Sequence, residues 1–197
     1  MSSEQTNSPL PLGEGLGERA YGAVTPSPSP SQGEGNDESG PAPITRDAIV
    51  AAARSFLGVP FRHQGVDPET GLDCRGLLIA VARKLGHEPR HEHRMNYKRH
   101  PDPAEFRAAL ESELEEIAVS DADDGDVVLV RALKQKPEEA THAGILASGR
   151  YERMIIHATD SDRQVLEEPY RPGHVRLAVA AFRFPGVTVD GRRSTVA

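Results

Sequence analysis

The sequence predicts an α+β domain in which N-terminal helices pack on an antiparallel sheet of about five strands. Apolar residues recur at helical spacing between residues 44 and 117, whereas after residue 120 they form short β-like runs separated by Gly, Pro or charged residues. Helices followed by strands along one chain are typical of helices that cover one face of an antiparallel sheet.

Residues 1–43 differ in composition from the rest of the chain. They contain 7 of the 16 Pro and 7 of the 18 Gly, and six acidic residues against one Arg contribute −5 of the formal charge of −7. Their few apolar residues bury too little surface to offset a backbone entropy cost of about 1–2 kcal/mol per residue. We therefore expect a disordered acidic tail at 1–43, a domain at 44–186 and a C-terminal tail at 187–197.

Composition excludes several classes of protein. A single cysteine cannot form an intramolecular disulfide, and no run of about 18 apolar residues is present that would span a membrane. Residues 44–197 carry 22 basic and 24 acidic residues, a balance that argues against nucleic-acid binding. The first seven residues lack the basic and apolar regions of a secretory signal, so we expect a cytoplasmic protein or one that a particle delivers.

Three helices are expected, each with an N-cap. Thr45 caps the first, which Gly58 ends; Asp73 caps the second, which places Cys74 in its first turn and ends at Gly86; Asp102 caps the third. The inward residues expected on the third helix are Phe106, Leu110, Leu114 and Ile117. Strands are expected at 126–132, 142–147, 151–158, 164–168 and 176–184.

Cys74 is a candidate nucleophile. Unpaired N–H groups and the positive end of the helix dipole stabilise a thiolate at a helix N-terminus, and Gly76 leaves space beside the sulfur. A lone cysteine is also typical of a small buried core residue. The choice between these interpretations depends on a second feature.

Two histidines of a predicted hairpin supply that feature. If Gly149 and Arg150 form a two-residue type II′ turn, His142 pairs directly with His157 on one face of the sheet. One imidazole then orients the other, which with Cys74 predicts a nucleophile, a base and an orienting residue. Two strand histidines with no catalytic role are the alternative.

Four segments resemble the motifs of the NlpC-type cell-wall cysteine peptidases: GLDCRGLL at 71–78, GDVVLV at 125–130, THAGIL at 141–146 and MIIHA at 154–158. The resemblance implies a papain-like fold, cleavage of peptidoglycan stem peptides between D-glutamate and a diamino acid, and no metal or organic cofactor. It implies Cys74 as nucleophile, His142 as base and His157 as third residue. The segment 165–186 resembles the phage-tail members, which implies phage tail components as partners. A catalytically silent tail module and a thiol amidase or acyltransferase are the alternatives.

The sequence departs from the family pattern beside the nucleophile. Arg75 follows Cys74 where many members have a small residue, and it is either a contact for an acidic stem-peptide carboxylate or an exposed helix residue. Phe61 stands where many members have a Tyr whose hydroxyl lies near the oxyanion. We therefore expect backbone N–H groups, with His63 or Gln64, to stabilise the oxyanion.

Two further clusters of potential metal ligands are not interpreted as metal sites. His91 and His93 provide only two of the three or four ligands that a zinc site needs. The acidic residues 121–126 lack the spacing of a calcium loop. Both are interpreted as solvated loops.

Overall fold

The computed structural model describes residues 44–89, 97–98, 101–131, 135–171 and 177–188. The expected tail at 1–43 and the His91 and His93 pair lie outside these residues. No helix in the described ranges is long and apolar enough to cross a membrane.

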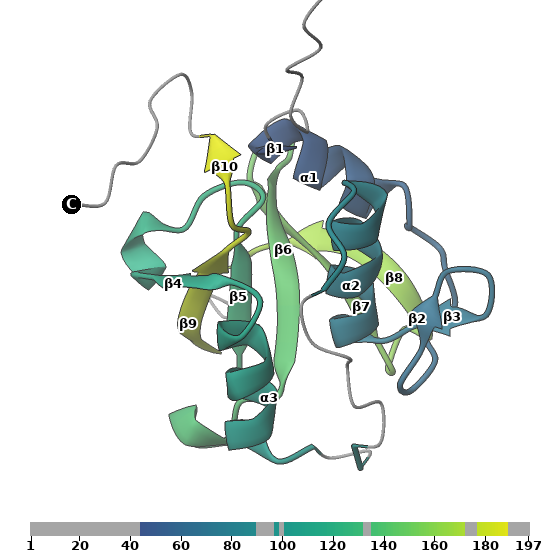
Figure 1. Cartoon of the computed structure of the whole chain (residues 1–197), viewed down its shortest axis with the longest axis vertical. Helices are drawn as coiled ribbons and strands as arrows, with labels where there is room; N and C mark the ends of the chain where they lie inside the picture. The colour runs from purple at the N-terminus through teal and green to yellow at the C-terminus, as the bar shows by residue number, and fades with distance from the viewer. Residues whose placement is uncertain (1–43, 90–96, 99–100, 132–134, 172–176, 189–197) are drawn as a thin grey trace, which may run out of the picture. The chain divides into compact units, whose positions relative to one another are not determined.

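The described residues form an α+β fold built on one six-stranded antiparallel sheet (Figure 1). Its strand order is β4-β9-β5-β6-β7-β8. The strands are β4 (Glu115–Ile117), β5 (Val127–Val130), β6 (His142–Ser148), β7 (Arg153–Thr159), β8 (Gln164–Pro169) and β9 (Ala178–Arg183). The five strands expected from the sequence are present, and β4 is the sixth.

Three α-helices pack with one face of this sheet around the main core. They are α1 (Arg46–Arg54), α2 (Cys74–Lys84) and α3 (Pro103–Glu111), and Figure 1 shows α1 and α2 on the same side of the sheet. Ile49, Leu77 and Phe106, one from each helix, join alternate residues of β6 such as Ile145 in one buried cluster. The other face carries a smaller cluster that includes Leu146 and Ile155. This division follows from the two-residue period of side chains along a strand.

Smaller elements complete the fold. Two-stranded sheets are formed by β2 (Val66–Asp67) with β3 (Gly71–Leu72), and by β1 (Ile44–Thr45) in parallel with β10 (Val187–Thr188). Two 3-10 turns, η1 (Val119–Asp121) and η2 (Pro137–Glu139), flank β5. The pairing of β1 with β10 brings the first two residues expected to be a C-terminal tail into a sheet.

The N-terminal helix caps agree with the sequence prediction, but the first helix ends at Arg54, before Gly58, and the third helix is also shorter than expected. The side chains of Thr45, Asp73 and Asp102 each accept a hydrogen bond from a backbone N–H in the first turn of the helix that follows. However, α3 ends at Glu111, and Ile117 lies on β4 opposite Ala181 of β9. The prediction that Ile117 continues the helix was wrong because cross-strand pairing competes with helical spacing at this position.

A buried carboxylate joins α1 to the sheet. Asp126 is 0% exposed, and its oxygens accept hydrogen bonds from Nε and Nη2 of Arg183 at 2.9 Å each. Arg46 of α1 adds an ion pair at 3.0 Å, and the N–H of Asp123 donates a further hydrogen bond. Such a charge is stable inside a protein only when it is paired in this way. Within the acidic segment 121–126, Asp126 therefore has a structural role.

Candidate active site

The first turn of α2 holds Cys74 against a close-packed loop. Asp73 is 4% exposed, and its Oδ1 accepts a hydrogen bond from the N–H of Gly76 at 2.8 Å. A Cβ atom at Gly76 would lie 1.7 Å from the carbonyl oxygen of Gly65, so only glycine fits there. Gly76 thus allows the loop before β2 to contact the start of the helix directly.

The other oxygen of Asp73 binds two groups that arrive from outside α2. Its Oδ2 accepts a hydrogen bond from the N–H of Gln64 at 2.7 Å and another from the hydroxyl of Tyr97. Gln64 adopts a φ of 60°, a backbone conformation that non-glycine residues rarely adopt, and the hydrogen bond to Asp73 helps to hold it. Asp73 therefore connects the loop before β2, the start of α2 and the connection between α2 and α3.

Cys74 is partly buried at the end of β6. The backbone N–H groups of Ala143 and Arg75 lie close enough to its sulfur to lower the pKa of the thiol. Burial, followed by the charge of Asp73, raises the pKa of the Cys74 thiol to about 12, against smaller opposing effects of these N–H groups and of the Arg75 charge. Desolvation therefore opposes the stabilisation of a thiolate that the helix N-terminus provides.

The hairpin that carries the two histidines has a different turn from the one expected. Ser148 pairs with Arg153, so four residues form the loop, and the N–H of Gly149 donates to the carbonyl of Glu152 at 2.9 Å. The predicted type II′ turn, and with it the direct pairing of His142 with His157, was wrong. The register differs from the predicted one by two residues, and an even shift leaves both histidines on the same face.

The histidines nevertheless meet, diagonally across β6 and β7. Nε2 of His142 lies 2.8 Å from Nδ1 of His157, which is within hydrogen-bond distance. A Cβ atom at Gly144 would lie 3.1 Å from Cβ of His157, so the absence of a side chain there keeps the diagonal path open. His157 is 5% exposed, and its Nε2 lies 3.2 Å from Oε1 of Glu168 on β8. A carboxylate at this position favours a proton on Nε2 and leaves Nδ1 to accept from His142.

A comparison of the sequence with known protein families agrees with this fold. The model of the NlpC/P60 family fits residues 58–182, which is most of the described chain. The chain belongs to the NlpC/P60 family. No curated protein matches the sequence.

Solved NlpC/P60 structures share this fold. The NlpC/p60 domain of the peptidoglycan hydrolase SagA is 22% identical with a TM-score of 0.50, and the match covers 72% of this chain and 100% of that domain. An NlpC/P60 family protein from Bacillus cereus ATCC 10987 is 19% identical with a TM-score of 0.53, covering 73% of this chain and 41% of that one. NlpC2 from Trichomonas vaginalis is 18% identical with a TM-score of 0.52, covering 78% and 49%. This chain therefore spans less than half of the last two proteins.

Three of the four predicted substrate-binding residues of the NlpC/P60 domain gather around Tyr97. The guanidinium carbon of Arg75 lies 4.8 Å from the centroid of the Tyr97 ring, and the His63 ring meets that ring edge-on at 5.4 Å. The side-chain amide of Gln64 donates to the carbonyl of Tyr97. Phe61, the fourth, forms a β-bridge with Leu72 and packs against the main core.

Sequence reasoning missed Tyr97, the buried role of Asp73, and Glu168. Asp73 was predicted only as a helix cap, although an acidic cap beside a candidate nucleophile also affects the ionisation of the thiol. Tyr97 lies in a connection with no periodic pattern, so nothing in the sequence placed it beside Cys74. Glu168 was expected on a strand, but its approach to His157 depends on the register of β7 with β8.

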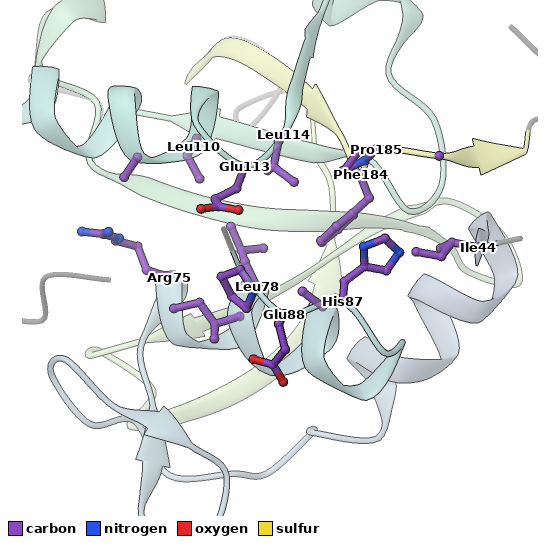
Figure 2. Close-up of a pocket in the computed structure, with 15 residues that line it drawn as sticks. Ile44, Arg75, Leu78, His87, Glu88, Leu110, Glu113, Leu114, Phe184 and Pro185 are labelled. Atoms are coloured by element: carbon purple, nitrogen blue, oxygen red, sulfur yellow. The ribbon is translucent and has the colours of Figure 1, made fainter. Parts of the chain in front are cut away.

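A pocket of about 320 Å³ lies between α2 and α3 in the NlpC/P60 domain. Figure 2 shows Arg75 at one end and Ile44 at the other, with Leu78 facing Leu110 and Leu114 across the space. No group of three or more His, Cys, Asp or Glu residues within the described ranges has the arrangement of a metal site.

Proposed function

We propose that this NlpC/P60 domain is a cysteine endopeptidase that hydrolyses peptidoglycan stem peptides. The proposal is carried by a histidine pair on β6 and β7, His142 and His157, together with the only thiol of the chain, Cys74, at the start of α2. His142 immediately precedes Ala143, whose backbone N–H lowers the pKa of the Cys74 thiol. SagA, a protein with the same fold, is a peptidoglycan hydrolase.

In the proposed reaction His142 removes the proton of the Cys74 thiol as the sulfur attacks the peptide carbonyl. A thiol with a raised pKa suits this order of events, because the proton leaves during the attack. The C–N bond then breaks, His142 returns the proton to the leaving amine, and water hydrolyses the thioester to regenerate the thiol. His157, with Glu168 behind it, holds the imidazole of His142 in one orientation.

Substrate contacts are assigned to the residues around Tyr97. Arg75 carries a cation next to the nucleophile and suits the free carboxylate of a D-glutamate in the stem peptide. His63 and Gln64 lie on the facing loop, and Phe61 supplies apolar contact from the core side. Replacing Arg75 with Ala is expected to raise KM for an anionic stem peptide more than it lowers kcat.

The test is hydrolysis of purified muropeptides by the wild type and by Cys74→Ala, with new amino groups quantified and products identified by mass spectrometry. Wild-type cleavage that Cys74→Ala lacks supports the peptidase. Equal product from both proteins, or none from either, contradicts it. Transfer of the acyl group to an added amine in preference to water would instead indicate an acyltransferase on the same fold.

Delivery by a phage or phage-like particle is the second part of the proposal. The resemblance of residues 165–186 to phage-tail members supports it. Fractionation of induced lysates, with an antibody against this chain, is expected to place the protein with tail particles. Its absence from purified particles would contradict this route.

A further inference from the structure

Tyr97 is held by four neighbours at the start of α2. Its hydroxyl donates to Asp73, its ring lies against Arg75 and His63, and its carbonyl accepts from Gln64. Burial and then Asp73 raise the pKa of Tyr97 above its ordinary value, so the phenol keeps its proton and remains a donor. The three side-chain contacts and the hydrogen bond to the backbone carbonyl of Tyr97 together fix the position of its hydroxyl.

The Asp73 carboxylate is an unfavourable neighbour for a nucleophile. It precedes Cys74, it is buried, and its negative charge opposes the formation of a thiolate. Its Oδ1 binds the N–H of Gly76, whereas Oδ2 binds the N–H of Gln64 and the hydroxyl of Tyr97. Each donor spreads part of the carboxylate charge away from the sulfur.

We propose that Tyr97 is a positioning residue for Cys74, because its hydroxyl draws the charge of Asp73 away from the sulfur and so favours the attacking thiolate. This inference rests on the proposed role of Cys74 as nucleophile. Tyr97 acts through Asp73, so it is not assigned a contact with the substrate.

Other charged and polar groups lie near the sulfur of Cys74, and a test of Tyr97 has to leave them unchanged. The first turn of α2 presents Asp73 and Arg75, the connection to α3 presents Tyr97, and β6 presents the N–H of Ala143, the residue that follows His142 in the chain. His157 on β7 and Glu168 on β8 lie behind His142. The change Tyr97→Phe keeps the ring against Arg75 and His63 and removes only the hydroxyl.

The experiment measures alkylation of the full-length protein by iodoacetamide, which reports on Cys74 alone because the chain has one cysteine. At about pH 9, below the raised pKa, we expect Tyr97→Phe to react about threefold to tenfold more slowly than the wild type. Tyr151→Phe is the matched control, since Tyr151 is 86% exposed on the hairpin loop, and it is expected to react at the wild-type rate.

Replacing Asp73 with a neutral N-cap residue tests whether the effect of Tyr97 on the reactivity of Cys74 depends on the Asp73 carboxylate. Asp73→Asn and Asp73→Ser keep a side-chain oxygen for the N–H of Gly76 and remove the charge, so both are expected to react faster than the wild type. In either background Tyr97→Phe should cause no further slowing. A thermal melt of each variant identifies a cap that fails to fold, and the other cap then gives the comparison.

Two outcomes would overturn the inference. One is a wild-type alkylation rate in Tyr97→Phe; the other is equal slowing by Tyr97→Phe with and without the carboxylate at position 73. Alkylation needs no peptide substrate, so an inactive peptidase with the expected alkylation rates would refute the proposed function and leave the role of Tyr97 standing.

Discussion

Nε2 of His142 lies 2.8 Å from Nδ1 of His157, although the two residues are not directly opposite one another in the sheet. A Cβ atom at Gly144 would lie 3.1 Å from Cβ of His157, so the glycine leaves room for His157 in this position. The ring of His157 holds that of His142, and the other ring nitrogen of His157, Nε2, lies close to the carboxylate of Glu168. Several measurable consequences follow from this arrangement and from the buried groups around it.

Removing either histidine should separate the role of the base from that of the orienting residue. We expect His142→Ala to lower kcat for muropeptide hydrolysis by about 10²- to 10⁴-fold, the usual contribution of a general base. His157→Ala should lower kcat less, because His142 remains but loses its orientation. His87→Ala is the control, since His87 is exposed after α2, and it should keep wild-type kcat. Equal activity in His142→Ala would exclude it as the base.

Gly144→Ala should damage the site more than the fold. The added Cβ would lie 2.7 Å from side-chain atoms of Ile155, which can move, and 3.1 Å from Cβ of His157. We expect the free energy of unfolding to fall by about 1–3 kcal/mol, as for other overpacked sites. Hydrolysis should fall further than this loss explains, because His157 is displaced from His142. Urea denaturation and steady-state kinetics measure the two effects, and unchanged kinetics would argue against the diagonal contact.

The alkylation of Cys74 should depend on pH up to unusually alkaline values. A pKa of about 12 means that the thiol is protonated at neutral pH, and the thiolate fraction rises about tenfold per pH unit below that pKa. We expect the iodoacetamide rate to keep rising beyond pH 9, whereas the urea-unfolded chain should level off near the ordinary cysteine value of about 8.5. A plateau below pH 8 in the folded protein would contradict a desolvated thiol.

The same pKa predicts how stability changes with pH. The folded pKa is above the unfolded one, so the contribution of Cys74 is fully present below about pH 9 and decreases as pH rises towards 12. We expect the free energy of unfolding of the wild type to fall more steeply over this range than that of Cys74→Ala. Parallel curves from chemical denaturation at several pH values would show that the thiol is not buried.

Asp126→Asn should be among the most destabilising single substitutions in the domain. It leaves Arg183 and Arg46 without the carboxylate that they share, and removing one partner of a buried ion pair costs about 3–5 kcal/mol. Asp123→Asn is the matched control, because its ion pair with Arg153 is exposed and is worth about 1 kcal/mol or less. Urea denaturation of both proteins makes the comparison, and similar losses would contradict the structural role of Asp126.

Local chemistry explains which parts of the fold were predictable. The caps at Thr45, Asp73 and Asp102 depend on residues within one turn, so the sequence identifies them. The end of α3 depends on pairing with β9, which the sequence of the helix does not contain. Leu114 and Ile117 fit a helical pattern, yet Leu114 is buried after the helix has ended and Ile117 lies on β4.

In the candidate site, too, the features that depend on local sequence were predictable and those that depend on tertiary packing were not. The histidines were placed on one face from the predicted turn together with the strand period, and that placement survives the wrong turn because the register differs by two residues. The effect of burial on the thiol could not be predicted from the sequence, because burial depends on the packed fold whereas the helix end does not. Tyr97 enters the site from a connection without periodicity, and its position is a tertiary property that no spacing in the sequence records.

The short parallel pair of β1 and β10 places the first described residues of the domain beside its last ones. Ile44 lies next to Val187, so a chain that enters the domain leaves it at the same place. A module with this layout can be inserted into a loop of another protein without forcing that loop apart, and it tolerates new ends elsewhere once the old ones are joined. The fold is therefore portable between larger proteins, whatever the segments on either side of it do.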